Sequence, residues 1–391
     1  MKTKILFMLM PVMSIALTSC GQVLNYQENL DKYVFAMEYH DDFNVLQLTD
    51  IHWNYNSSTT RSKQYLDKVF AEAQKHAGKI DLVELTGDQF MLSNTYHVST
   101  FLEFMEEEAE KYGFTYTAIW GNHDRHGLYN PNWLADQFKN AKHCLYVEPN
   151  DNLYGRSNFV INLTLDGTKE SATVWQLFNL DSGASFSETS VSPFRDYDYI
   201  RKDQTDWFVK EHALVGETVP SIAYYHIPQD ENLKAWNAIH EDNLPLKNKF
   251  FKLEEFADNG NEEYASDFLD VAANHNLKAA FMGHAHNVDW TVEYLFEDET
   301  THLPTHPVVI GLGVKTGTEL YFAHIEKDGE DPFMKEGFDS VKTELELQGK
   351  NENFDLIGAS LVTIKNGLDF DLEHLYLNER AEGDYVAWVK W

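Results

Sequence analysis

The feature that most constrains this chain is an alternation of short apolar runs with helical segments near its N-terminal third. The runs are rich in β-branched and aromatic residues, as strands are, and the intervening segments carry apolar side chains at helical spacing. In order, these segments are 43–49, 61–77, 80–86, 98–109 and 115–120. Such a βαβαβ order predicts an α/β fold in which helices cover a mostly parallel sheet.

The rest of the chain shows no internal repeat and no clean linker. We therefore expect one domain over residues 43–391, preceded by a signal segment at 1–19 and by a tether and first edge segment at 20–42. Residues 229–262 are polar with scattered aromatics and suggest a lid insertion, and late strands are expected within 308–391.

Polar residues follow the predicted strands at the points where the strands end. These motifs are Asp50-x-His52, Gly87-Asp88, Gly121-Asn122-His123-Asp124, His226 and Gly283-His284-x-His286. In open α/β sheets, ligands bind beyond the carboxyl ends of the strands, so residues far apart in sequence can meet there.

The side-chain types in these motifs suit a metal site. Imidazole, carboxylate and amide donors without sulfur match Mn, Fe, Zn or Co, and they do not resemble a thiolate site or an all-oxygen calcium cage. A single D-x-H or a lone histidine occurs often by chance. The full ordered set, each member at the end of an apolar run, is much harder to explain by chance.

In this order the motifs resemble the calcineurin-like metallophosphoesterase superfamily, over roughly residues 43–290. Within it, the stretches 46–52, 198–207 and 225–228 are most similar to small phosphatases of the purple-acid-phosphatase-like branch. The resemblance implies an α/β four-layer sandwich of two mixed β-sheets flanked by helices.

The resemblance also implies a role for each motif residue. The residues that would hold one divalent ion are Asp50, His52, Asp88 and His286. Those that would hold a second ion are Asp88, Asn122, His226 and His284. His123 would act in catalysis without binding metal, and Asp124 would orient its ring. Purple members carry a tyrosine ligand three residues after the bridging aspartate, whereas this chain has Met91.

The implied reaction is hydrolysis of a phosphate ester by a hydroxide that bridges two divalent ions (Mn, Zn or Fe), with His123 assisting the leaving group. Monoesters are favoured over diesters on the branch resemblance alone. Two other classes stay open: a non-catalytic surface lipoprotein with a metal-stabilised scaffold, and a two-lobed solute-binding lipoprotein. The ligand positions are all filled, which weakens the first, and the second does not explain the histidines. The oligomeric state stays open.

The charge balance argues against one class of partner. The chain has 31 Lys and Arg against 63 Asp and Glu, a formal net charge of −32. Duplex nucleic acid would be repelled by such a surface, and no run of basic residues offsets this. A small phosphate ester is different, because bound metal ions can reverse the local field.

The N-terminus predicts export and lipid anchoring. Two lysines precede a short apolar run, which is typical of a secretory signal and too short for a usual membrane span. The run ends in Leu17-Thr18-Ser19-Cys20, which resembles a bacterial lipobox. We therefore expect cleavage before Cys20, acylation of that cysteine, and attachment to the outer face of a bacterial membrane.

Replacing the acylated residue tests this expectation. Cys20→Ser should release the protein from membranes or trap its uncleaved precursor, because anchoring depends on the acyl chains. Fractionation and intact mass of both forms check it. A soluble wild-type protein with an unmodified Cys20 thiol would contradict the prediction.

Overall fold

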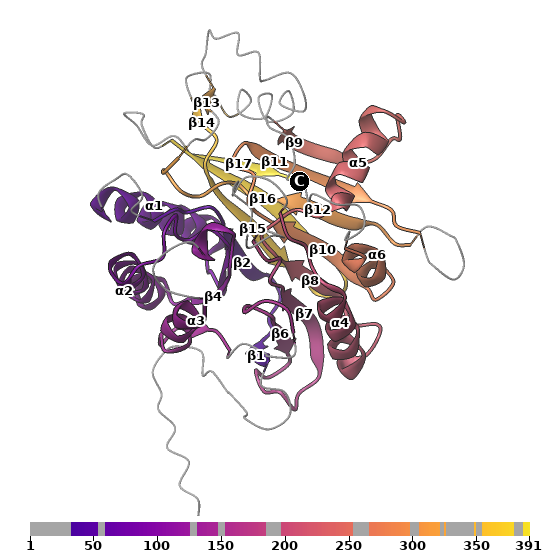
Figure 1. Cartoon of the computed structure of the whole chain (residues 1–391), viewed down its shortest axis with the longest axis horizontal. Coiled ribbons are helices and arrows are strands. Elements are labelled where there is room, and N and C mark those ends of the chain that lie inside the picture. Colours follow the sequence, from indigo (N-terminus) through magenta and orange to yellow (C-terminus); the bar gives the residue numbers. More distant parts are fainter. Residues whose placement is uncertain are drawn as a thin grey trace, which may run out of the picture.

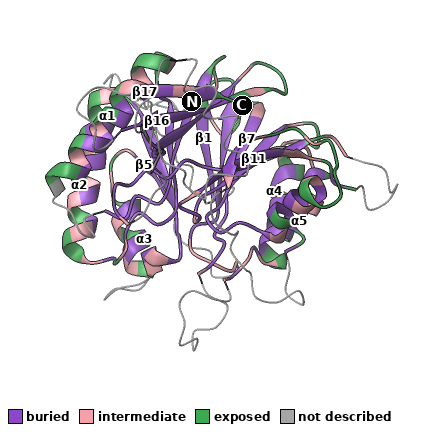
Figure 2. Ribbon diagram, turned by 90° about the horizontal axis from the view of Figure 1, so that it is seen from above, coloured by how far each residue is buried: buried purple, intermediate pink, exposed green. Residues whose placement is uncertain are grey.

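Two β-sheets packed against each other form the framework, and helices cover the outer face of each (Figures 1 and 2). The computed structural model describes residues 33–391 except 54–58, 126–130, 148–152, 185–196, 253–265, 298–304, 321–323, 326–347, 349–353 and 379–385. The expected α/β sandwich of two mixed sheets flanked by helices is confirmed.

The first sheet contains the predicted βαβαβ unit. Its seven strands lie in the order β17-β16-β15-β2-β3-β4-β5. In sequence order they are β2 (Phe43–Leu48), β3 (Leu82–Thr86), β4 (Thr115–Ile119), β5 (Cys144–Leu145), β15 (Gly358–Ile364), β16 (Phe370–Leu377) and β17 (Val386–Lys390). The strands β2 to β5 pair in parallel, and the three late strands join them antiparallel through β15. The helices on this side are α1 (Thr59–Ala77), α2 (Thr95–Tyr112) and α3 (Pro131–Lys139).

The second sheet has eight strands in the order β1-β6-β7-β8-β10-β12-β11-β9. In sequence order they are β1 (Val34–Glu38), β6 (Phe159–Thr164), β7 (Thr173–Asn179), β8 (Ser221–Tyr224), β9 (Asn248–Lys252), β10 (Leu277–Met282), β11 (Val288–Tyr294) and β12 (Val308–Leu312). The helices on this side are α4 (Lys202–Val215), α5 (Asp230–His240) and α6 (Phe268–Ala273). Outside these two sheets, β13 (His324–Ile325) pairs with β14 (Phe354–Asp355), and a 3-10 turn spans His123–Arg125.

Helix α2 shows how the sequence produces these elements. Its apolar positions at helical spacing are buried, including Val98, Phe101 and Met105, and they face the sheet (Figure 2). The side chain of Asn94 accepts a hydrogen bond from the His97 N–H and so caps the first turn. Gly113 ends the helix with φ of 77°, a left-handed conformation that glycine adopts without steric cost.

The segment 229–262 differs from the expected lid where it is described. Residues 230–240 form α5, and 248–252 form β9, which pairs with β11 at the edge of the second sheet. Strand β9 is therefore built into the second sheet, because backbone pairing with β11 satisfies its hydrogen bonds on that side. The remaining residues of that segment, 253–262, lie outside the described residues.

The predicted signal segment (1–19) and most of the predicted tether lie outside the described residues. Within the part of the chain that the structure describes, no helix combines the length and apolar character needed to cross a bilayer.

Candidate metal centre

The polar motifs lie on loops that extend the pairing of neighbouring strands. Beyond β2 and β3, the Asp50 N–H donates to the Gly87 carbonyl at 3.1 Å, and the His52 N–H donates to the Asp88 carbonyl at 3.0 Å. In the second sheet, the Gly283 N–H donates to the His226 carbonyl at 3.0 Å, beyond β8 and β10. Backbone hydrogen bonds therefore fix the loops relative to one another before any side chain is considered.

The segment after β12 joins the two sheets at this edge. Lys315 forms an isolated parallel bridge with Thr49, and the Thr316 N–H donates to the Thr49 carbonyl at 2.8 Å. The buried Lys315 Nζ also donates to the Asp50 carbonyl oxygen at 2.8 Å. These contacts bring the strand ends of one sheet against those of the other.

Three predicted ligands form a first cluster. Asp50, His52 and His286 each offer a donor atom within 4.8 Å of the others, and all three are buried. The Nε2 atoms of His52 and His286 lie 3.0 Å apart, and His286 Nε2 lies 3.5 Å from Asp50 Oδ1.

A second cluster forms beside the first. Asp88, His226 and His284 each offer a ligand atom within 4.8 Å of the others. The Asn122 side chain lies beside them and completes the group. The Asn122 Oδ1 atom lies 3.2 Å from His226 Nε2 and 2.9 Å from His284 Nδ1. The structure thus brings together all seven residues predicted to bind metal.

Asp88 connects the two clusters through one oxygen. Its Oδ2 atom lies 3.9 Å from His52 Nε2 and 3.4 Å from His226 Nε2. Its Oδ1 atom instead accepts the His123 backbone N–H at 2.8 Å. The second oxygen is therefore used to fix the carboxylate, and only Oδ2 faces both clusters.

The donor spacing fits bound metal ions. Nitrogen and oxygen ligands lie about 2.0–2.2 Å from zinc, so two ligands of one ion are roughly 3–3.5 Å apart. Most of the separations above fall in or near that range. In addition, the buried Asp50 Oδ1 has no hydrogen-bond partner, which is costly for a carboxylate unless a cation lies beside it.

Protonation within the clusters suits metal binding with one exception. Burial lowers the pKa of His52 well below its usual value and that of His284 to about 3, so both rings are neutral. Although burial opposes it, the neighbouring histidines hold the pKa values of Asp50 and Asp88 below the ordinary value. Burial also lowers the pKa of His226, but Asp88 outweighs it and raises the value to about 9. An ion binding there must displace that proton.

The ring of His226 is already oriented for such a role. Its Nδ1 atom lies 2.9 Å from the Thr86 carbonyl oxygen, which accepts the Nδ1 proton and directs Nε2 toward Asp88. A carbonyl acceptor behind a histidine is the usual way in which proteins orient a metal-binding ring.

The backbone is strained at four of the predicted ligands. Asp50, His52, Asp88 and His284 have φ values of 53°, 48°, 53° and 76°, in the left-handed region that side chains disfavour. Such conformations cost on the order of 1–3 kcal/mol each and cluster at functional sites. Here the hydrogen bonds between the loops hold these residues in place.

The His123 ring lies beside the first cluster, whereas the Asp124 carboxylate is buried against loop backbone. The His123 ring lies edge-on to the His52 ring, with centroids 5.3 Å apart, and it is only partly buried. The buried Asp124 carboxylate accepts the Phe90 N–H at 2.9 Å and the Gly121 N–H at 2.8 Å. The role of Asp124 in orienting the His123 ring stays a prediction, and in the described residues both Asp124 oxygens hold loop backbone.

Tertiary structure adds neighbours that the motifs did not single out. The Tyr197 ring packs edge-on against His284, with centroids 4.3 Å apart, and Arg125 forms an ion pair with the buried Asp181. No spacing in the sequence signals either contact. Next to His52 in the chain, Trp53 is fully buried and stacks on Phe104.

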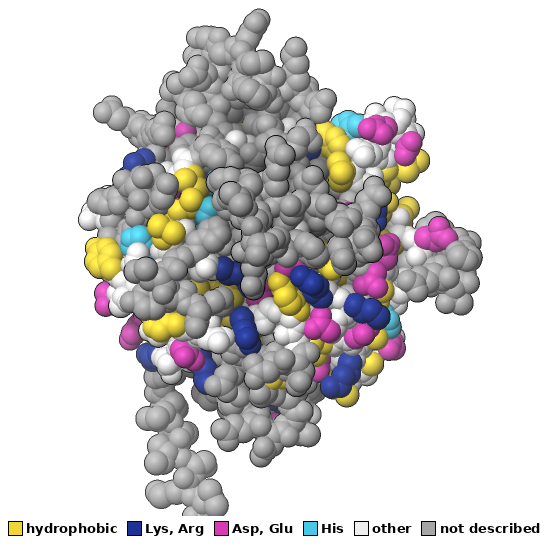
Figure 3. Space-filling model, in the orientation of Figure 1, with side chains coloured by type: hydrophobic (Ala, Val, Ile, Leu, Met, Phe, Trp, Pro, Cys, Tyr) yellow, Lys and Arg dark blue, Asp and Glu magenta, His cyan; other side chains and the backbone are white. Residues whose placement is uncertain are grey.

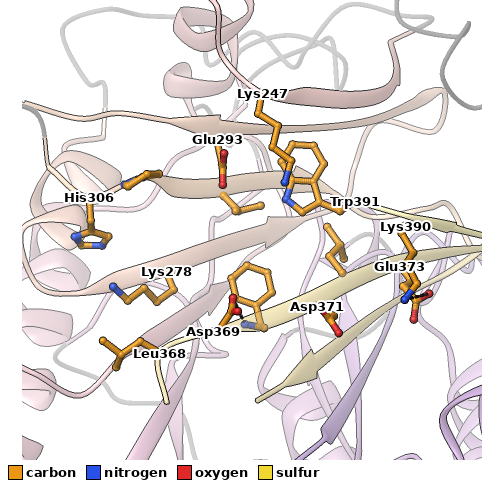
Figure 4. Close-up of a pocket in the computed structure, with 14 residues that line it drawn as sticks. Lys247, Lys278, Glu293, His306, Leu368, Asp369, Asp371, Glu373, Lys390 and Trp391 are labelled. Atoms are coloured by element: carbon orange, nitrogen blue, oxygen red, sulfur yellow. Dashed lines mark hydrogen bonds and ion pairs between the residues drawn. The ribbon is translucent and has the colours of Figure 1, made fainter. Parts of the chain in front are cut away.

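A pocket of about 360 Å³ lies elsewhere in the sandwich (Figure 4). Its lining includes Lys278 and Val309, near the starts of β10 and β12, together with Phe370 and Trp391 from the late strands. The candidate metal centre lies beyond the opposite ends of those strands, so this pocket is separate from it.

Comparison with known proteins decides the family. The model of the calcineurin-like phosphoesterase family matches residues 43–288, which include every residue of both clusters. This chain belongs to the calcineurin-like phosphoesterase family. Family membership and the two clusters together support a metal-dependent phosphoesterase.

Two more distant similarities accompany the family match. The "Probable inactive purple acid phosphatase 28" of Arabidopsis thaliana is 24% identical over 292 residues, which cover 65% of this chain and 68% of that protein. The structure of the NAD nucleotidase NadN of Haemophilus influenzae matches with a TM-score of 0.36 and 13% identity. That match covers 90% of this chain and 53% of the other.

Glycine 121 offers a test of the loop packing. A Cβ atom at Gly121 would lie 2.1 Å from Asp88 Oδ1, so Gly121→Ala must displace the shared carboxylate. We expect metal affinity to fall about 10–100-fold, as for other residues that orient metal ligands. Gly113→Ala is the control, since its Cβ would meet nothing within 4 Å and only the left-handed backbone is strained. That change should cost about 1–2 kcal/mol of stability and leave metal content unchanged. Equal metal affinity in both variants would contradict this description of the site.

Proposed function

We propose that this protein is a hydrolase of phosphate esters that uses two divalent metal ions. The observation that carries the proposal is the placement of Asp88 Oδ2 between the two clusters of potential metal ligands, 3.9 Å from His52 Nε2 and 3.4 Å from His226 Nε2. One cluster would be Asp50, His52, Asp88 and His286, and the other Asp88, Asn122, His226 and His284.

Divalent ions at such a site supply a water of lowered pKa and neutralise charge on phosphoryl oxygens. The chain's own residues would hold the centre in place and assist the leaving group. Asp88 is fixed by the His123 N–H, so its charge stays aligned between the clusters. The His123 ring lies beside the His52 ring at the partly exposed side of the centre. From there, His123 would donate a proton to the leaving oxygen or stabilise charge on it.

The charge of the centre explains how an acidic protein can bind an anion. The described Lys and Arg side chains lie among Asp and Glu on the face drawn in Figure 3, and the net charge of the chain is −32. Asp50 and Asp88 bring two negative charges to the centre, whereas two divalent ions bring four positive ones. A phosphate ester would therefore meet local positive charge, whereas duplex nucleic acid would meet a repelling surface.

A preference for monoesters over diesters is part of the proposal. Its support is the resemblance to purple-acid-phosphatase-like enzymes and the name of the Arabidopsis relative. That name also calls the relative inactive. In this chain, the complete ligand set and His123 favour turnover over a non-catalytic binding role. We also propose that the enzyme works outside the cell membrane, anchored through acylated Cys20.

Two substitutions separate metal binding from catalysis. Asp88→Asn should lower both metal content and rate, because it weakens the group shared by both clusters. His123→Ala should keep the metal and lower the rate about 10²–10⁴-fold, the usual contribution of a general acid. The measurements are elemental analysis and hydrolysis of an aryl phosphate monoester and the matching diester by metal-reconstituted protein.

The exposed His240, which lies on α5 away from the centre, supplies the control variant His240→Ala. Loss of metal from His123→Ala as complete as from Asp88→Asn would contradict the division of roles. Faster hydrolysis of the diester would overturn the monoester preference, and no hydrolysis of either ester by metal-loaded wild type would favour a binding role.

Met91 predicts the kind of metal. At the position where purple enzymes carry a tyrosinate, Met91 offers a neutral thioether, which suits a hard trivalent ion poorly. We expect a colourless enzyme that is active with divalent Mn, Zn or Fe. Tyr197 lies beside His284, so Tyr197→Phe is the informative companion variant. An intense visible band in iron-loaded wild type that disappears in Tyr197→Phe would show that Tyr197 replaces the missing ligand.

A further inference from the structure

A third group of potential metal ligands lies at the far end of the second sheet. His212 is in the last turn of α4, Glu217 follows that helix, and His275 follows α6. Each offers a donor atom within 4.8 Å of the others. Glu217 Oε2 lies 3.7 Å from His212 Nδ1 and 3.0 Å from His275 Nδ1.

The orientation of His212 is the observation that points to a ligand. Its side chain is fully buried and stacks on Phe208, with centroids 5.9 Å apart and ring planes at 13°. Its Nε2 atom lies 2.8 Å from the Val219 carbonyl oxygen, which can only accept, so Nε2 carries the proton. The lone pair is therefore on Nδ1, which is buried, has no hydrogen-bond partner and faces Glu217.

A surface ion pair explains only part of this arrangement. Glu217 is largely exposed and hydrogen bonds His275, which is common on protein surfaces without any metal. Such a pair gives no reason for a buried imidazole to direct an unprotonated nitrogen at the same carboxylate. Leaving a buried hydrogen-bond acceptor such as Nδ1 unpaired is unfavourable. A cation bound between the ligand atoms of His212, Glu217 and His275 removes that cost.

The backbone holds the two loops that carry these residues. The Asn276 side-chain amide donates to the Thr218 carbonyl at 2.8 Å, and the Ser221 N–H donates to the Asn276 carbonyl at 3.2 Å. Helices α4 and α6 pack against each other, as Figure 1 also shows. The loops enter the adjacent parallel strands β8 and β10, so the spacing of the ligands is set by the sheet.

We propose that His212, Glu217 and His275 bind a divalent transition-metal ion, best matched by Zn²⁺, at a site distinct from the candidate metal centre. Two imidazoles and one carboxylate are a common zinc ligand set, and the exposed side of Glu217 leaves room for a water as fourth ligand. The six residues of β10 span roughly 20 Å, which separates His275 from His284 beyond the other end of that strand. The ion would cross-link two loops and stabilise the fold, and it would take no part in phosphate chemistry.

Metal counting on the full-length protein tests this site. Chelator-treated wild type, Glu217→Gln, His275→Ala and the control His240→Ala are loaded with Zn²⁺, freed of excess ion and measured by elemental analysis and thermal unfolding. We expect both site variants to hold about one zinc fewer per chain than wild type and His240→Ala. Zinc should also raise the unfolding temperature of these two variants less than that of wild type and His240→Ala.

Asp88→Asn distinguishes this site from the candidate metal centre. That variant should lose metal from the centre and keep the zinc ion bound by His212, Glu217 and His275. The double variant Asp88→Asn/Glu217→Gln should therefore hold about one zinc ion per chain fewer than Asp88→Asn. The test stands even if the centre holds fewer than two ions, because each variant is compared with its own parent. Zinc content and zinc-induced stabilisation that are the same in wild type, Glu217→Gln and His275→Ala would overturn the proposal.

Discussion

The buried carboxylate of Asp88 is the group on which the arrangement of the centre depends. A charged carboxylate inside a protein is costly unless it is hydrogen-bonded and faces positive charge. One oxygen meets this requirement through the His123 N–H, and the other lies between His52 and His226. Gly121 has no side chain and so leaves the space that the Asp88 carboxylate occupies. The loop after β4 is therefore shaped around the loop after β3. Loops from both sheets therefore converge on a single oxygen.

The energetic balance of this edge explains why the loops are strained and yet ordered. Left-handed backbone at four predicted ligands is unfavourable, and so is burying two carboxylates together. Backbone hydrogen bonds between neighbouring loops and the link from Lys315 and Thr316 to Thr49 offset part of this cost. Ions bound between the clusters would offset more, since they replace His226 protonation as the source of positive charge. Metal binding and folding of this edge would therefore be coupled.

The two ends of the second sheet differ in the residues that they bring together. Beyond the carboxyl ends of β8 and β10, His226 and His284 join residues of the other sheet, so that end can hold a reacting ligand between the sheets. At the amino ends, His212, Glu217 and His275 lie at the ends of α4 and α6, on the connections that lead into β8 and β10 of one sheet. An ion there would contact one layer of the sandwich, which suits a role in stability.

The sequence by itself determined the local elements and the identity of the donors. Periodic apolar residues predict the strands and helices, as in α2, and the motifs after strands identify all seven residues that the two clusters bring together. Only the tertiary structure decided how single atoms are used. Contacts between segments far apart in the chain make Asp88 face both clusters through one oxygen and make Asp124 hold loop backbone. Such contacts also place Tyr197 and Lys315 beside the centre. The same holds for β9, which is an edge strand of the second sheet, and for His212, whose Nδ1 is left without a partner because Nε2 bonds the Val219 carbonyl. Spacing along a chain encodes neighbours within one element, whereas the direction of a side chain is settled by the packing of one sheet on another.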